Sequence, residues 1–311
     1  MNILVTGAYG FVGLNLAKAF NDKFKMYALD IKYKESEYYD YYYAWNELYV
    51  LPWENIDIVI HLAGKAHDIK NKGNEKDYFE INTELTKRIF DCFLQSTAKQ
   101  FFFFSSVKAI SDTCEFDFLT EDVTPKPYGP YGESKLKAEE YILSKQWDEK
   151  SVYIFRPCMI HGPGNKGNLN LLYNVVSKGL PYPLGAYENK RSFLSIWNLL
   201  FIIEKFINKN PESGVYNLAD DEAISTNELI KLIAMSKNKK ERIWRINHSL
   251  INIVAKMGTI CRLPFNQERL IKLTENYMVS NEKIKRTLEI DQLPYTVKEG
   301  LLQTLKYFKG Y

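Results

Sequence analysis

Two tyrosines and a lysine in residues 127–135, which read PYGPYGESK, have types and a spacing that could do chemistry. Tyr131 stands four residues before Lys135 in a stretch whose pattern predicts a helix, so the two side chains should share one helical face. A phenol has a pKa of about 10, and its phenolate needs stabilisation of about three pKa units, or roughly 4 kcal/mol, to exchange a proton near neutral pH. A neighbouring ammonium group supplies part of that stabilisation. Tyr128 has no such partner, and we therefore predict that Tyr131 is an acid–base residue.

The chain begins with an apolar, strand-like run that leads into TGAYGFVG at residues 6–13 and then into the helical run LNLAKAF. The glycines of this segment, Gly7, Gly10 and Gly13, permit a tight turn and let the backbone approach a pyrophosphate. The N-terminus of the helix that follows offers oriented N–H groups to the same anion. A glycine triplet alone is weak evidence, but a strand before it and a helix after it predict the phosphate cradle of a dinucleotide.

Asp30 ends the second apolar run, KMYALD. A carboxylate at this place can accept hydrogen bonds from both hydroxyls of an adenosine ribose, whereas it would repel a 2′-phosphate. Asp30 therefore favours NAD as the cofactor, with NADP less favoured, and Lys32 weakens this preference slightly. The alternative interpretation is that Asp30 only caps a turn.

Short apolar runs alternate with helix-length segments through the first half of the chain. The runs NILVTG, KMYALD, IDIVIHLAG, QFFFFSS and SVYIFRP are typical of strands covered on both faces. Strands that alternate with helices predict crossover units and a parallel sheet, here a doubly wound α/β Rossmann domain. We expect the four phenylalanines at 101–104 to lie in a buried central strand.

The pattern changes near residue 158, where Gly and Pro cluster and strands become scarce. We expect an NAD-binding domain over residues 1–157, rejoined by about 193–217, and a smaller, interleaved α/β substrate-binding domain over 158–192 and 218–311. The runs SFLSI and GVYNLAD are candidate late strands of the first sheet, and the tail from Asn227 onward is expected to be helical. The Tyr-rich residues 36–49 show no steady period, so we interpret them as a surface loop and leave a partner or ligand surface open.

These motifs in this order resemble the extended short-chain dehydrogenase/reductases of the NAD-dependent epimerase/dehydratase family, which act on nucleotide sugars. The resemblance rests on TGAYGFVG, Asp30, HLAG at 61–64, the serine pair at 105 and 106 and the Y-x-x-x-K pattern at 131–135, and RPCMIHGPG and RSF continue it. It covers the chain nearly end to end. Within the family, the sequence is most similar to proteins of the UDP-glucose 4-epimerase type and to 4-ketoreductases of surface-polysaccharide pathways.

The resemblance implies a role for each matching residue. Ser106 would hydrogen-bond the reacting hydroxyl, Tyr131 would move its proton, and Lys135 would support Tyr131 and bind the cofactor. Asn168 and Arg191 match positions that hold the substrate's nucleotide diphosphate, a role that suits a guanidinium because its fork meets phosphate oxygens in pairs; an ordinary surface charge is the alternative for Arg191. The implied cofactor-binding residues are Gly7, Gly10, Phe11, Val12, Gly13, Asp30, Leu62, Ala63, Lys65, Ser105, Tyr131, Lys135 and Pro157.

The implied reaction is NAD-dependent epimerisation at C4 of a UDP- or dTDP-hexose, in surface-polysaccharide or sugar-nucleotide biosynthesis. Val107 and Lys108 follow Ser106 where the family's dehydratases place Asp-Glu, so 4,6-dehydration of a sugar is not expected. A 4-ketoreductase for nucleotide-4-keto-6-deoxyhexoses is the alternative, and a non-catalytic dinucleotide-binding regulator is a third reading. The adenine contacts cannot be assigned from the sequence.

Composition adds only broad limits. With 41 basic and 38 acidic residues and a net charge of +3, we expect no nucleic-acid partner and no membrane partner. The four cysteines form no C-x-x-C pair, which predicts free thiols in a cytoplasmic protein, and the four histidines, including His67, lack metal-ligand spacing, so no metal is expected. The run SLINIVAKMGTICRLPF is too short and too charged to span a membrane, and we expect a packed helix there. Family analogy suggests a homodimer.

Overall fold

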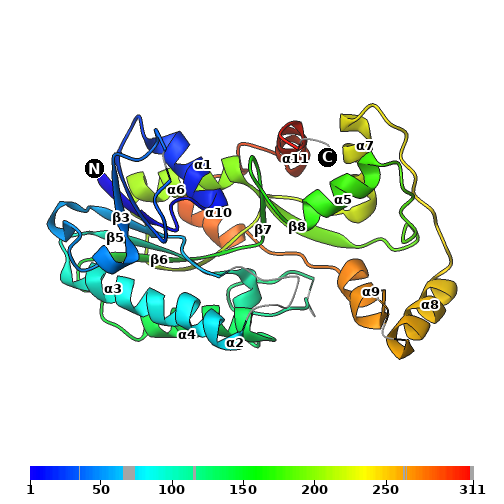
Figure 1. Cartoon of the computed structure of the whole chain (residues 1–311), viewed down its shortest axis with the longest axis horizontal. Helices are drawn as coiled ribbons and strands as arrows, with labels where there is room; N and C mark the ends of the chain where they lie inside the picture. Colours follow the sequence, from blue (N-terminus) through cyan, green and yellow to red (C-terminus); the bar gives the residue numbers. More distant parts are fainter. Residues whose placement is uncertain (35, 66–73, 115–116, 262, 264, 309–311) are drawn as a thin grey trace.

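The computed structural model describes residues 1–34, 36–65, 74–114, 117–261, 263 and 265–308, and its main feature is a seven-stranded sheet (Figure 1). The strands lie in the order β3-β2-β1-β4-β5-β6-β9, and each neighbouring pair is parallel. Their bounds are Asn2–Thr6 (β1), Lys25–Asp30 (β2), Tyr41–Ala44 (β3), Ile58–His61 (β4), Gln100–Phe104 (β5), Ser151–Pro157 (β6) and Gly214–Leu218 (β9). This order confirms the predicted doubly wound Rossmann fold, with its switch point between β1 and β4.

Helices cover both faces of this sheet (Figure 1). On one face lie α1 (Phe11–Phe20), α6 (Ile196–Lys209) and α10 (Glu282–Leu288), whose apolar side chains join one large core cluster. On the other face lie α3 (Leu85–Gln95) and α4 (Pro130–Leu143), which pack on a second cluster. A short helix, α2 (Glu75–Tyr78), runs through a π-helical segment, Phe79–Glu84, into α3.

The phenylalanine run explains why both faces are covered. Successive side chains of a strand point to opposite faces, so a wholly apolar run must be buried on both sides. Phe102 and Phe104 lie in the cluster with α1 and α6, whereas Phe101 and Phe103 lie in the cluster with α3 and α4. The prediction of a buried central strand at 101–104 is confirmed.

A smaller three-stranded sheet, in the order β10-β8-β7, lies beside the main one. It consists of Met159–His161 (β7), Lys190–Ser195 (β8) and Ala223–Ser225 (β10), and α5 (Asn168–Ser177), α7 (Thr226–Ser236) and α11 (Val297–Lys306) pack around it. The two candidate late strands therefore belong to different sheets. GVYNL joins the main sheet as β9, but SFLS lies in the smaller sheet within β8. Beyond them, α8 (His248–Ile260) and α9 (Gln267–Thr274) form a helical hairpin that projects from the rest of the molecule (Figure 1).

The interpretation of residues 36–49 as a surface loop is wrong in part. Tyr41–Ala44 is the edge strand β3, which pairs with β2 and leads into a 3₁₀ turn at Trp45–Glu47. Tyr39, before the strand, donates one hydroxyl to the carbonyls of both Ala8 and Gly13 in the glycine turn, at 3.0 Å each. A four-residue edge strand is only partly covered, so no hydrophobic period marks it; the β-propensity of the tyrosines was the available signal.

Three short 3₁₀ turns complete the described elements that bear on the site: Trp45–Glu47, Trp53–Asn55 and Val107–Ala109. All four cysteines are described and none forms a disulfide. Among the described helices, none has the length and apolar character required to cross a bilayer.

Replacing Phe102 by Ala should lower the free energy of unfolding by about 3–5 kcal/mol, because its ring is wholly buried in the central strand and its loss leaves a cavity. Phe118→Ala is the control: its ring is 51% exposed, and we expect a change below about 0.5 kcal/mol. Urea titrations followed by circular dichroism measure both. Equal losses in the two variants would contradict the central position of β5.

Candidate active site

The glycine turn between β1 and α1 forms a backbone cradle. Gly7 has a φ of +66°, and a Cβ atom there would lie 2.8 Å from the Cα of Ala63, so only glycine fits the close approach of the two loops. A Cβ atom on Gly13 would lie 2.4 Å from the carbonyl oxygen of Ala8, which fixes how closely α1 packs on the turn. The helix then begins at Phe11 without a side-chain cap from the described residues. Its first amides are therefore available to an anion such as a pyrophosphate.

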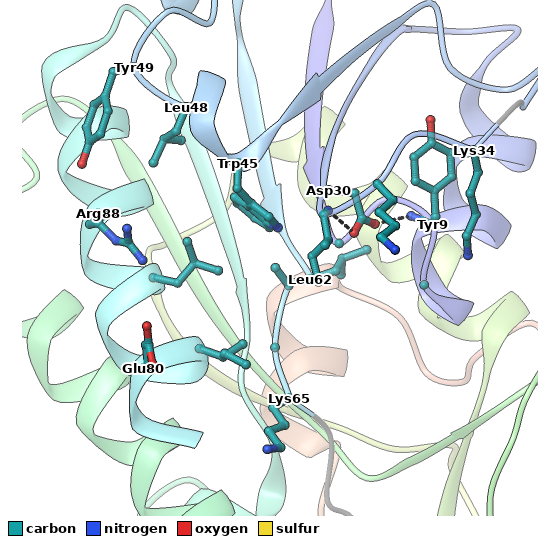
Figure 2. A pocket seen from close by; sticks show the side chains of 18 residues that line it. Tyr9, Asp30, Lys34, Trp45, Leu48, Tyr49, Leu62, Lys65, Glu80 and Arg88 are labelled. Carbon is teal, nitrogen blue, oxygen red and sulfur yellow. Dashed lines mark hydrogen bonds between the residues drawn. The ribbon is translucent and has the colours of Figure 1, made fainter. Parts of the chain in front are cut away.

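Asp30 lies at the carboxyl end of β2 and faces this turn. One carboxylate oxygen accepts the amide of Tyr9 at 2.8 Å, and the other accepts the amide of Ile31 at 2.7 Å (Figure 2). Asp30 thus caps the turn, as its alternative interpretation proposed. Each carboxylate oxygen can accept a second hydrogen bond, so the cap leaves capacity for ribose hydroxyls, and that role stays a prediction.

A cavity of about 890 Å³ opens beside the turn and Asp30. Its size suits half of a dinucleotide or more, and its walls come from the ends of β1, β2 and β4, the turn after β3, and α3. Six of the implied cofactor-binding residues line it: Gly7, Gly10, Asp30, Leu62, Ala63 and Lys65.

Sequence reasoning missed the far wall of this cavity. Trp45, Leu48 and Tyr49 lie in the Tyr-rich residues 36–49, and Leu85 and Arg88 lie on α3 (Figure 2). In Figure 2 the Trp45 ring lies between Asp30 and Leu48. The ring gives this side of the cavity, next to the end of β2, an apolar surface. A tryptophan among strand-prone tyrosines near a dinucleotide turn was the signal that could have found this wall.

The remaining implied cofactor residues do not line this cavity. Phe11 and Val12 pack half-buried against the main core, and Pro157 is buried at the end of β6. Ser105 is buried, and its hydroxyl hydrogen-bonds the carboxylate of Glu139 on α4.

Tyr131 and Ser106 meet where β5 ends and α4 begins. Ser106 is buried and follows β5, and its hydroxyl hydrogen-bonds the phenol of Tyr131. Lys135 lies one turn further along α4, almost fully buried, and donates from Nζ to the carbonyl of Phe104 at 2.8 Å. A Cβ atom on Gly64 would lie 3.0 Å from that Nζ, and Gly64 lines the cavity. The lysine therefore lies directly behind the cavity wall.

Burial shifts the pKa values of the pair in opposite senses. Desolvation raises the pKa of Tyr131, and the hydrogen bond from Ser106 only partly offsets this. Desolvation lowers the pKa of Lys135 to about 8, against the opposing effect of the Glu139 carboxylate. The chain by itself thus keeps the phenol protonated, and a further positive charge is needed to release its proton near neutral pH.

Asn82 is a site residue that sequence reasoning missed. It is wholly buried in the π-helical segment, a distortion that is frequent at functional sites. Its amide accepts from the backbone of Lys65 at 2.7 Å and donates to the hydroxyl of Ser134 at 2.9 Å. Thr83 donates to the Ser134 carbonyl at 2.8 Å. These bonds tie α4, next to Lys135, to the loop that lines the cavity; a polar residue on the buried face of an amphipathic helix was the available signal.

A buried ion pair joins α4 to strand β6 of the main sheet. Glu139, one turn after Lys135, pairs with Arg156 of β6, whose Nε lies 3.1 Å from both carboxylate oxygens. Because each partner is almost fully buried, removing one would leave an uncompensated charge. The pair therefore fixes the rotation of α4, and with it the direction of Tyr131 and Lys135.

The two residues implied for substrate binding lie on the smaller sheet's side of the molecule. Asn168 is exposed at the first turn of α5. Arg191, on β8, donates from Nη2 to the carbonyl of Lys272 at the end of α9 and lies 3.8 Å from the Glu275 carboxylate. Their contact with a diphosphate stays a prediction.

Three further residues considered in the sequence analysis, Tyr128, Lys108 and His61, do not line the cavity. Tyr128 is 83% exposed, and Lys108 pairs with Asp112 at 3.1 Å. His61 packs at the end of β4, where its ring nitrogens contact the hydroxyls of Thr6 at 2.6 Å and Thr86 at 2.8 Å. His67 lies outside the described residues.

Comparisons with known proteins show which family the sequence matches. Residues 3–219 match the model of the NAD dependent epimerase/dehydratase family. The chain is 30% identical to UDP-glucose 4-epimerase of Vibrio cholerae, over 99% of this chain and 95% of the relative. It is 27% identical to N-acetyl-alpha-D-glucosaminyl-diphospho-ditrans,octacis-undecaprenol 4-epimerase of Escherichia coli O157:H7, over 98% of this chain and 95% of the relative.

Its fold is similar to that of UDP-glucuronic acid 4-epimerase from Bacillus cereus, solved in complex with NAD. The TM-score is 0.75 at 18% identity, over 99% of this chain and 98% of the other. At this identity the likeness concerns the fold.

Asp30→Asn should lower the affinity for NAD relative to NADP by about tenfold or more. The amide keeps an oxygen for the turn but loses the charge that strengthens bonds to ribose hydroxyls and repels a 2′-phosphate. Isothermal titration calorimetry with each dinucleotide measures the ratio, and Asp22→Asn, at an exposed position after α1, is the matched control. An unchanged ratio would show that Asp30 serves only the turn.

The lowered pKa of Lys135 predicts a pH-dependent stability. Between the folded value of about 8 and the unfolded value of about 10.4, the unfolded chain binds more protons, so this residue makes the folded state more stable as the pH rises. Across that window, the unfolding free energy of the NAD-free wild type should gain about 3 kcal/mol relative to Lys135→Met. Urea titrations at several pH values test this; a constant difference between the two proteins would mean that the lysine has an ordinary pKa.

Proposed function

The chain belongs to the NAD dependent epimerase/dehydratase family, and we propose that it is an enzyme that epimerises C4 of a nucleotide-linked hexose with NAD as its cofactor. The observation that carries the proposal is the hydrogen bond between Ser106 and the Tyr131 phenol, with buried Lys135 one helical turn away at the cavity wall. The two relatives reported above, each matched over nearly the full chain, carry the name 4-epimerase, which favours C4 as the reacting carbon.

The residues around the cavity fit a dinucleotide. The amides at the start of α1 would bind the pyrophosphate, Asp30 would bind the adenosine ribose, and the apolar surface of Trp45 and Leu48 would receive the adenine. The Lys135 ammonium would hold the second ribose from behind Gly64. When bound, NAD supplies the acceptor, and then the donor, of the hydride exchanged with the sugar.

The proton chemistry belongs to the chain's own residues. Tyr131 would take the proton of the C4 hydroxyl as the sugar is oxidised, and Ser106 would hold that hydroxyl in line with the phenol. Because burial raises the pKa of Tyr131, the phenolate form needs the positive charge of Lys135 together with that of the oxidised cofactor. Tyr131 returns the proton when the 4-keto sugar is reduced on its other face. The cycle is redox-neutral overall, so the cofactor can stay bound.

A sugar attached to a lipid diphosphate is a second candidate substrate, and the name of one relative favours it. Arg191 would bind the diphosphate of either substrate, and its buried Nε has no hydrogen-bond partner among the described atoms. Its contact with the Lys272 carbonyl means that a diphosphate held by Arg191 would lie next to α9. The Escherichia coli relative is named for an undecaprenol-diphosphate-linked sugar. The homodimer, the cytoplasmic location and the place in polysaccharide biosynthesis stay predictions.

Replacing Tyr131 by Phe should reduce kcat by about 10²- to 10⁴-fold, because the acid–base hydroxyl is lost, while the affinity for NAD changes little. Tyr128→Phe, on the exposed neighbour, is the matched control and should retain activity. The assay follows interconversion of UDP-glucose with UDP-galactose, and of the corresponding N-acetylated pair.

Other outcomes of the same assay separate the alternatives. Consumption of NADH with a nucleotide-4-keto-6-deoxyhexose, without epimerisation of any UDP-hexose, would establish a 4-ketoreductase. Bound NAD without turnover of any substrate would favour a regulator. Equal losses in the two tyrosine variants would overturn the assignment of Tyr131.

A further inference from the structure

We propose that the hairpin of α8 and α9 docks this protein onto the surface of an anionic lipid bilayer. The proposal goes beyond the enzymatic activity and does not depend on it. It replaces the expectation, drawn from overall charge, that the protein has no membrane partner. Three features of the hairpin carry it: an unpartnered apolar stripe, a local excess of basic residues and its projection from the molecule.

The apolar stripe runs along the outer side of α8. The residues that form it recur at i, i+3, i+4, i+7 and i+10, so they lie on one helical face, and each is more than half exposed. The inner face differs: Ile251 and Ala255 are buried against Leu184 and Leu270. The stripe is formed by Leu250, Ile253, Val254, Met257 and Ile260.

Exposed apolar residues are also found beyond α8. Leu263 lies between the two helices, and Ile271 and Leu273 lie on α9, all with large exposed fractions. α8 packs mainly on α9, and Figure 1 shows the pair extending away from both sheets. Exposed apolar residues that share one helical face of a projecting element are typical of a site that meets a partner or a membrane.

Charge identifies the partner as an anionic surface. The hairpin itself, residues 248–274, holds four Lys and Arg against one Glu, a net charge of +3, and the segment that leads into it, residues 237–247, adds five Lys and Arg against one Glu. The whole chain has a net charge of +3, so the rest of the chain is net negative. Basic residues flanking an apolar helical stripe attract acidic lipid headgroups while the aliphatic side chains enter the headgroup boundary. A second copy of the same basic face would be repelled, which disfavours self-association through the hairpin.

Docking would also orient the active site. The carbonyl of Lys272 at the end of α9 accepts from Arg191, and Tyr277, just beyond α9, bridges to Arg191 in the backbone. The residue implied in diphosphate binding is therefore attached to the docking element. This last step rests on the proposed function: a sugar anchored to lipid by a diphosphate would meet the site at the headgroup level. Docking itself would hold for either substrate.

Vesicle co-sedimentation tests the proposal. The wild-type protein should bind vesicles of phosphatidylcholine with phosphatidylglycerol, bind much less to pure phosphatidylcholine, and lose binding as salt is added. Ile253→Asp with Met257→Asp should reduce binding to the mixed vesicles about tenfold or more. The matched control, Met235→Asp with Leu143→Asp, removes two exposed apolar residues elsewhere and should bind as the wild type does.

Charge is tested separately by Lys256→Glu with Arg269→Glu, which should weaken binding without touching the apolar stripe. Turnover of a soluble UDP-hexose should be the same in every variant, so a failure of the enzymatic proposal would not affect the vesicle result, and the reverse also holds. Equal binding by the Ile253/Met257 variant and the wild type would overturn the proposal, as would equal binding to neutral vesicles. A wild-type dimer that the same variant converts to monomer, without vesicle binding, would assign the stripe to self-association.

Discussion

The active-site arrangement depends on one buried ammonium group. Lys135 is almost fully removed from water and donates to the carbonyl of Phe104, at the end of the central strand β5. That bond helps to hold α4 against β5, where Tyr131, one turn earlier on α4, meets Ser106, two residues beyond the strand. It also explains Gly64, because a side chain there would press against the amino group. A buried cation with one hydrogen bond is unstable unless its surroundings hold it, and the Asn82 bonds to α4 and the Glu139–Arg156 pair beneath it provide that support.

The two pKa shifts show why this arrangement needs a ligand to become reactive. In the chain alone, burial raises the pKa of the Tyr131 phenol and lowers that of the Lys135 ammonium, so desolvation opposes the ion pair of phenolate and ammonium. A positively charged cofactor changes the balance, since it favours the phenolate and is itself favoured by it. Without that charge, burial keeps the Tyr131 phenol protonated. This coupling suits a cycle in which the oxidised cofactor is present at the start of every turnover.

The sequence could predict the features that depend on residues close together in the chain, and it could not predict those that depend on residues far apart. The strand and helix alternation, the glycine turn and the one-turn spacing of Tyr131 and Lys135 are local patterns, and the sheet order confirmed the fold that they imply. The missed features are long-range: Asn82 contacts Ser134 across 52 residues, and Arg191 contacts Lys272 across 81. Edge strand β3 was missed for a different reason. A short edge strand is open to solvent on one side, so its sequence shows no hydrophobic period. Trp45, in the turn directly after β3, was missed with it, although it lines the cavity.

The hairpin of α8 and α9 poses the opposite problem, because its apolar residues satisfy the expectation of a packed helix only on one face. Ile251 and Ala255 pack against other residues of the chain, whereas the stripe from Leu250 to Ile260 is exposed to solvent. Overall charge concealed the basic character of this region, since the near-neutral total averages a basic segment with an acidic remainder. An amphipathic segment is recognised by its local charge and its exposed face together. Because Arg191 contacts the end of α9, a surface that binds the hairpin would also set the direction from which a diphosphate held by Arg191 would arrive.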